Sequence, residues 1–180
     1  MRKKPSHVML IVLVLFLSLV IIQERNIGSA AEATTKVFVD PPETIDPSKV
    51  IGSTFIVKVN VSNVEELYGW QVNMTYNPAV LNTTVASIVE GPFLKQGGPT
   101  QVITKKVNNI LGNLLVTYML KIPYPPHGVN GSGTLVSITF KVKALERATL
   151  LRLVTDGLFP TKLNTIISGN PVPIEHTTED

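Results

Sequence analysis

Apolar and polar residues alternate along several segments of the chain, a period of two that is typical of β-strands with one buried face and one solvated face. The clearest alternation covers residues 54–62, 70–76, 114–122 and 134–143. Weaker strand candidates are residues 36–40, 84–89, 101–107, 150–155 and 165–168. The pattern predicts an all-β fold of about nine strands, an antiparallel sandwich of jelly-roll or immunoglobulin-like topology.

The stretch "LYGWQVNMTYNPAVL" (67–81) contains the only tryptophan of the chain. Strand parity places four of its residues on the inner face: Trp70, Val72, Met74 and Tyr76. The intervening residues on the outer face are Gln71, Asn73 and Thr75. The aromatic rings are therefore predicted to be core residues and not a sugar-stacking platform.

Proline and glycine divide the chain between these segments. Residues 123–133, "PYPPHGVNGSG", and the "SGNP" at 168–171 are rich in both, so neither is expected to form an interior strand. The polar residues 176–180 are expected to fray. The sandwich is therefore assigned to residues 34–175.

Residues 1–33 differ from the rest of the chain. A basic start, "MRKKPSH", precedes the uncharged apolar run 8–22, and small residues follow, with Ala31-Glu32-Ala33 nearest to a leader-peptidase site. The run is short for a membrane span, which favours a cleaved signal peptide over an uncleaved N-terminal anchor. Both alternatives predict an exported domain, extracellular or at the cell surface.

Composition removes several classes of function. Residues 1–33 hold four basic and two acidic side chains, which leaves 12 basic and 11 acidic side chains, without a basic run for nucleic acid or an anionic membrane. Membrane association is expected only through residues 8–22, if they are retained. The chain has no cysteine, which excludes thiol catalysis and thiolate metal sites.

Catalytic and cofactor motifs are poorly supported. No nucleophile elbow, phosphate loop or calcium loop is present, and His127 is interpreted as a solvated turn residue. Loop acids such as Glu90 show no pairing of the kind that glycoside hydrolysis needs. The prediction is a non-catalytic protein with no cofactor and no metal.

Four N-x-[ST] sequons are candidate glycosylation sites in an exported chain. They begin at Asn60, Asn73, Asn82 and Asn130. The first two fall on the polar parity of their strands and the last two lie beside turns. The alternative is that Asn, Ser and Thr are simply common on exposed β surfaces.

The ordered motifs "IGSTFIVKVNVSNVEELYGWQVNMTYNPAVL", "EGPFLKQGG", "GSGTLVSITFKVK" and "ISGNPVPIE" resemble the cohesin domain family. The resemblance spans residues 36–175 and implies a nine-stranded sandwich that binds a calcium-loaded dockerin module on one sheet face. It places Gln71, Asn73 and Thr75 on that face.

The leading hypothesis is an exported cohesin-like binding module that recognises a dockerin-type partner or an extracellular carbohydrate, in connection with polysaccharide breakdown. Two alternatives stay open: a small extracellular glycoside-active enzyme and a passive cell-surface structural domain.

Overall fold

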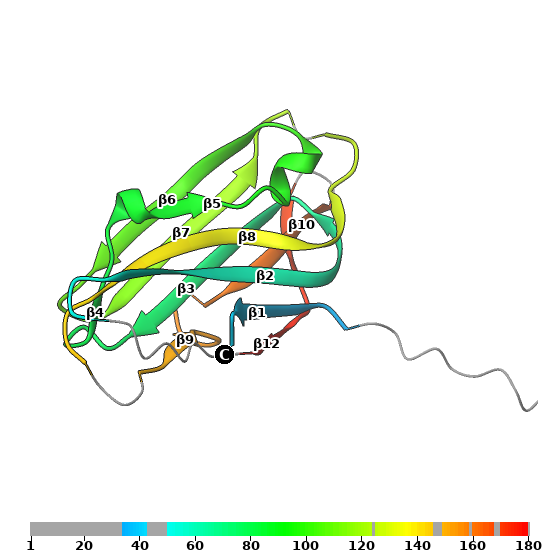
Figure 1. Cartoon of the computed structure of the whole chain (residues 1–180). Coiled ribbons are helices and arrows are strands. Elements are labelled where there is room, and N and C mark those ends of the chain that lie inside the picture. The colour runs from blue at the N-terminus through cyan, green and yellow to red at the C-terminus, as the bar shows by residue number, and fades with distance from the viewer. Residues whose placement is uncertain are drawn as a thin grey trace, which may run out of the picture. The chain divides into compact units, whose positions relative to one another are not determined.

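The computed structural model describes residues 34–42, 50–123, 125–145, 149–158, 160–167 and 170–179. The predicted leader, with its apolar run 8–22, lies outside the described residues. Thr34–Asp180 form one compact unit, in which two sheets pack face to face (Figure 1). Among the described residues, no helix has the length and apolar character that a membrane crossing requires.

Each sheet has six strands, named here after β2 and β3. The β2 sheet contains, in spatial order, β12 (Thr177–Glu179), β1 (Lys36–Asp40), β2 (Thr54–Leu67), β8 (Val129–Val142) and β4 (Leu81–Asn82), with β5 (Ile88–Glu90) also paired to β8. The β3 sheet contains β11 (Asn170–Ile174), β10 (Lys162–Ile167), β3 (Gly69–Tyr76), β7 (Asn113–Leu120) and β6 (Thr100–Asn108), with β9 (Leu151–Leu153) also paired to β3. Two short 3₁₀ helices are η1 (Val85–Ser87) and η2 (Leu94–Gly97).

The core lies between the two sheets and follows the predicted parity. Trp70 is fully buried, and its ring stacks on Tyr118 of β7 with centroids 5.3 Å apart. Tyr76 meets Phe140 of β8 edge to face at 5.2 Å, a contact that joins the two sheets. Full burial of large apolar side chains stabilises a fold by about 1.5–3 kcal/mol each, so these rings contribute strongly to the packing. The prediction of an all-β sandwich with an aromatic core is confirmed.

The strand assignment differs from the prediction at the start of β8. Residues 129–133, expected not to form an interior strand, pair with β2 through several register shifts. Asn63 and Glu66 of β2 adopt positive φ angles of 54° and 51° at these irregularities, and Gly131 of β8 has φ 112°. The extra residues of these β-bulges lie in β2, opposite the glycine-containing start of β8, and the prolines stay before the first residue of β8.

The end of the chain also differs from the prediction. Residues 177–179, expected to fray, form β12 and pair in parallel with β1, and the Thr177 amide donates to the Thr35 carbonyl at 3.0 Å. This long-range pairing has no local signal, because a three-residue polar segment carries no usable period. Together with β4 and β11, it brings the described residues to twelve strands, against about nine expected from the sequence.

Candidate partner-binding face

The outer face of the β3 sheet carries the residues that the resemblance pointed to. Gln71, Asn73 and Thr75 alternate with the core residues of β3 and stand beside residues of β7 on one side and of β10 and β9 on the other. Register places Gln71 opposite Thr117 of β7 and Lys162 of β10. These residues come from strands far apart in the sequence and form one surface only because the sheet brings them together.

Gln71 is not displayed on this surface, because it is only 7% exposed. Its Nε2 donates to the carbonyl of Pro160 at 2.7 Å, and its Oε1 accepts from the Thr117 hydroxyl at 3.2 Å. Both ends of the amide are therefore occupied within the protein. The prediction that Gln71 is shown to a partner is corrected: the side chain supports the face from below.

Asn73 marks the point where β3 exchanges one neighbouring strand for another. β3 pairs with β10 at residues 69–71 and with β9 at residues 74–76. Between them, the Thr161 hydroxyl accepts from the Asn73 amide at 3.2 Å and donates to its carbonyl at 3.1 Å. The Val154 amide also donates to the Asn73 carbonyl at 2.9 Å, and the Thr161 amide donates to the Val154 carbonyl at 2.6 Å. The base of the connection between β9 and β10 is thus fixed on β3.

Thr161 and Pro160 were missed by the sequence analysis. Thr161 is 4% exposed. Its hydroxyl bonds to the β3 backbone at Asn73, between the residues that pair with β10 and those that pair with β9. The only signal in the sequence is the Gly and Pro content of "TDGLFPT", which indicates a turn but not where that turn returns to the sheet. Thr75 is half-buried, with its hydroxyl 3.5 Å from the Arg152 carbonyl.

A hollow of about 280 Å³ lies on this face above Gly69. Gly69 opens the space because it has no side chain, and an added Cβ would lie 3.1 Å from the Tyr118 carbonyl oxygen. Besides Gly69, the residues around the hollow combine aromatic, aliphatic and polar groups: Tyr68, Trp70, Gln71, Ile103, Thr117, Tyr118, Met119, Lys162 and Asn164. Ile103 sits at an irregularity of β6 and is 54% exposed. The face therefore has a concave, partly apolar centre.

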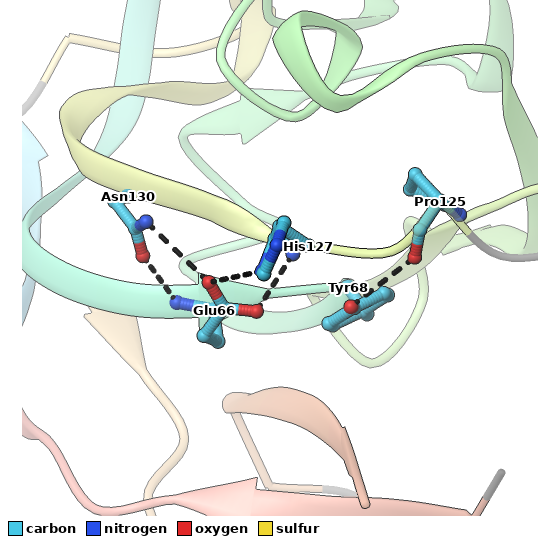
Figure 2. A network of polar contacts seen from close by, with 6 residues as sticks. Glu66, Tyr68, Pro125, His127 and Asn130 are labelled. Atoms are coloured by element: carbon cyan, nitrogen blue, oxygen red, sulfur yellow. Dashed lines mark hydrogen bonds and ion pairs between the residues drawn. The ribbon is translucent and has the colours of Figure 1, made fainter.

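A polar network fixes the corner between β2 and β3, and Figure 2 shows Glu66 at its centre. The Gly128 amide donates to Glu66 Oε2 at 2.9 Å, and the Glu66 amide donates to Asn130 Oδ1 at 2.6 Å. The Tyr68 hydroxyl donates to the Pro125 carbonyl at 3.3 Å, and burial together with the nearby Glu66 carboxylate raises the pKa of Tyr68. The network ties the β7–β8 connection to the end of β2.

His127 reaches this network only at its rim. Its side chain is 82% exposed, and Nδ1 lies 3.9 Å from Glu66 Oε1. A solvated histidine held only by one contact of this length is a poor general base. The interpretation of His127 as a turn residue therefore agrees with the structure.

The four sequons differ in how their side-chain amides are used. Asn60 Nδ2 donates to Asp40 at 3.3 Å, and Asn130 Nδ2 lies 3.5 Å from Glu66 Oε1. Asn73 lies within the paired part of β3, whereas Asn82 is half-buried in the two-residue strand β4. Glycosylation at any of the four stays a prediction; Asn130 is exposed, whereas Asn60, Asn73 and Asn82 are half-buried.

The acid suggested for a hydrolytic site is engaged in structural contacts. Glu90 Oε2 accepts from the Thr100 hydroxyl at 2.9 Å and lies 3.4 Å from Lys95 Nζ, with the glutamate side chain only 8% exposed. Within the described part of the chain, no group of three or more His, Asp or Glu side chains could hold a metal ion.

Comparisons with known proteins agree with this architecture. A family model for the cohesin domain matches residues 46–172. A type II cohesin of Acetivibrio cellulolyticus solved in a cohesin–X–dockerin complex is 17% identical, with a TM-score of 0.60 over 81% of this chain and 95% of that chain. The second type II cohesin of the ScaA scaffoldin from the same organism is 19% identical, with a TM-score of 0.61 over 80% of this chain and 86% of that chain.

An archaeal protein shares the fold as well. A non-cellulosomal cohesin from the hyperthermophile Archaeoglobus fulgidus is 17% identical, with a TM-score of 0.52 over 81% of this chain and 87% of that chain. A search of curated protein sequences found no match. Because the family model covers well over half of the sequence, the chain belongs to the cohesin domain family.

Proposed function

We propose that this chain is an exported, non-catalytic cohesin module that binds a dockerin-type protein module through the outer face of its β3 sheet. The observation that carries the proposal is the concave centre of that face, above Gly69, in a chain of the cohesin family. Members of this family are protein-interaction modules and not enzymes, which agrees with the sequence prediction.

Solved relatives support the class of partner. One similar structure is a complex of a type II cohesin with an X-dockerin, and another is a scaffoldin B cohesin in complex with a Cel5 dockerin, both from Acetivibrio cellulolyticus. The second is 14% identical to this chain, so each likeness supports the shared fold and not the individual contacts. A dockerin-type partner is therefore proposed for this chain at the level of the class.

A glycan partner is less well supported than a protein partner. Sugar-stacking sites need aromatic faces turned to solvent, and among the described residues every aromatic side chain is buried or half-buried. Trp70 and Tyr76, two aromatic residues of the stretch 67–81, are 0% and 5% exposed. Tyr68, Trp70 and Tyr118 are among the residues that line the hollow, but all three are buried or half-buried, so the face offers no exposed ring platform.

Export is proposed from the leader-like residues 1–33 and from the extracellular setting in which cellulosomal cohesins work. A module that meets its partner outside the cell would need no cysteine, because its sandwich core supplies stability without disulfides.

The test is binding to calcium-loaded dockerin modules encoded in the same genome, measured by calorimetry with and without a calcium chelator. Leu115, half-buried on the outer face of β7 opposite Asn73, is replaced by aspartate. Ile56, 58% exposed on the β2 sheet, is replaced by aspartate as the matched control.

The proposal predicts that at least one calcium-loaded dockerin binds, that Leu115→Asp abolishes this binding, and that Ile56→Asp leaves it unchanged. If no dockerin binds, or if both variants bind as the parent does, the proposed function is wrong.

A further inference from the structure

Charge is distributed unequally between the two sheets. The strands of the β3 sheet contain four basic residues and no acidic residue in the part of the chain that the structure describes: Lys105, Lys106, Arg152 and Lys162. The strands of the β2 sheet carry both signs, for example Lys58 and Lys141 beside Asp40 and Glu65. The candidate partner-binding face is thus the one whose strands are uniformly basic.

Three of these side chains belong to the outer face. Lys106 is exposed and lies opposite Leu115, Arg152 is exposed and lies opposite Thr75, and Lys162 lines the hollow. The acids closest in sequence to β9, β10 and β11 in the described chain are Asp156, in the β9–β10 connection, and Glu175, which follows β11, and both are exposed.

Lys162 lines the hollow and places a positive charge beside it. It is half-buried and pairs in register with Gln71. Among the described residues it forms no ion pair. A lysine whose charge is partly withdrawn from water and uncompensated gains most when an incoming carboxylate reaches it.

The centre of the face favours an apolar group. The amide of Gln71 below it is already bonded at both ends, to Pro160 and Thr117, so it has little capacity left for a ligand. Ile103 and Met119 contribute the walls, and Ile103 is 54% exposed in the unbound protein. An apolar anchor seated in a pocket and surrounded by polar contacts is the usual arrangement at the centre of a protein interface.

We propose that the partner presents an aliphatic side chain to the hollow above Gly69 and a carboxylate to Lys162, within a surface that is acidic opposite Lys106 and Arg152. This rests on the proposed function and adds the chemistry of the partner to it. An acidic partner is steered toward a basic face, so association is fast at low salt and slows as salt screens the charges.

Two pairs of variants test the proposal on the dockerin that binds the parent protein. Lys162→Glu is compared with Lys58→Glu, an exposed lysine of the β2 sheet, and Ile103→Asp is compared with Ile56→Asp, whose parent side chain is 58% exposed against 54% for Ile103. Lys162→Gln is included as a milder change, and melting temperatures establish that each variant is folded. Affinity and association rate are measured at about 50 and 500 mM salt, where the Debye length differs about threefold.

The proposal predicts that Lys162→Glu and Ile103→Asp each weaken binding by about tenfold or more, a loss in the range seen when a central contact of an interface is removed. The two β2-sheet controls stay within about twofold, as exposed substitutions outside an interface do. Lys162→Glu also flattens the salt dependence of the association rate.

Other outcomes separate the two proposals. A dockerin whose binding is abolished by Leu115→Asp but is insensitive to salt, Lys162→Glu and Ile103→Asp would overturn the inference and leave the proposed function intact. Failure of every dockerin to bind would overturn both. Binding of polygalacturonate in place of any dockerin, lost in Lys162→Glu, would show that the basic face serves an acidic glycan and would refute a protein partner.

Discussion

Replacement of Trp70 by alanine tests the packing that positions the binding face. The ring is 0% exposed, stacks on Tyr118 at 5.3 Å with an interplanar angle of 29°, and lies on the inner side of the same strand that carries Gln71 and Asn73. The indole nitrogen has no hydrogen-bond partner in the described structure, so the loss comes from packing alone. Truncation of a buried tryptophan to alanine costs about 3–5 kcal/mol of the free energy of unfolding.

For a domain of this size, each kcal/mol corresponds to about 2–4 °C in melting temperature, so Trp70→Ala should lower the melting temperature by about 6–20 °C. Urea unfolding followed by circular dichroism gives the free energy directly, and it does not depend on the fluorescence of the residue that is removed. Trp70→Phe should fall between the parent and the alanine variant, because it keeps a ring against Tyr118.

A matched surface change gives the baseline for this measurement. Ile103→Ala, on the exposed edge strand β6, should alter stability by no more than about 0.5 kcal/mol. If Trp70→Ala costs less than about 1 kcal/mol, the ring is not a core residue, and the assignment of inner and outer faces for β3 fails with it.

Three further changes probe contacts around the sandwich. Asn109→Ala removes the acceptor for the Tyr76 hydroxyl (2.7 Å) and for the Thr83 amide (3.1 Å), and thermal unfolding should show a loss of about 1–3 kcal/mol. Gly128→Ala places a Cβ against the backbone of Glu66 without room for it, so urea unfolding should show a loss of about 1–3 kcal/mol, and an unchanged midpoint would contradict the close approach. Burial raises the pKa of Tyr76, so the tyrosine of the unfolded chain ionises at a lower pH than that of the folded protein. The contribution of Tyr76 to the free energy of unfolding should therefore be fully present below about pH 10 and fall at higher pH. Tyr76→Phe should weaken this pH dependence in urea titrations at increasing pH.

The alternation of residues was sufficient to predict the core of β3. A pleated strand sends successive side chains to opposite faces, so the burial of Trp70, Val72, Met74 and Tyr76 follows from their spacing alone. The all-β class and the cohesin resemblance were predicted for the same reason, because they depend on the order of several such strands. The sheet proposed to carry the candidate face came from the family resemblance, and its role in binding stays a prediction.

The burial of Gln71 could not be predicted in this way. Parity turns Gln71 outward, but the β9–β10 connection returns to the sheet and places the Pro160 carbonyl against its amide. That contact joins residues 89 positions apart, and nothing in the local sequence encodes it. The same holds for Thr161, whose hydroxyl bonds to Asn73 across a separation of 88 residues.

The prediction that residues 129–133 form no interior strand failed for a different reason. Glycines were interpreted as interruptions, whereas in the structure they accompany bulges in a long pair of strands. Gly128 also lies so close to Glu66 that a larger residue would not fit without movement. Glycine therefore marked a close approach between two chain segments, which local patterning does not distinguish from a loop.

The most direct test of the central claim uses the two methionines of the domain as opposed probes. Met119 is half-buried beside the hollow on the outer face, whereas Met74 is 0% exposed on the inner side of the same sheet. With ¹³C-methyl-methionine labelling and addition of a calcium-loaded dockerin, the account predicts that the Met119 methyl signal shifts with saturation and that the Met74 signal stays in place. A dockerin that binds while the Met119 signal remains unchanged would contradict the claim that this face is the binding site.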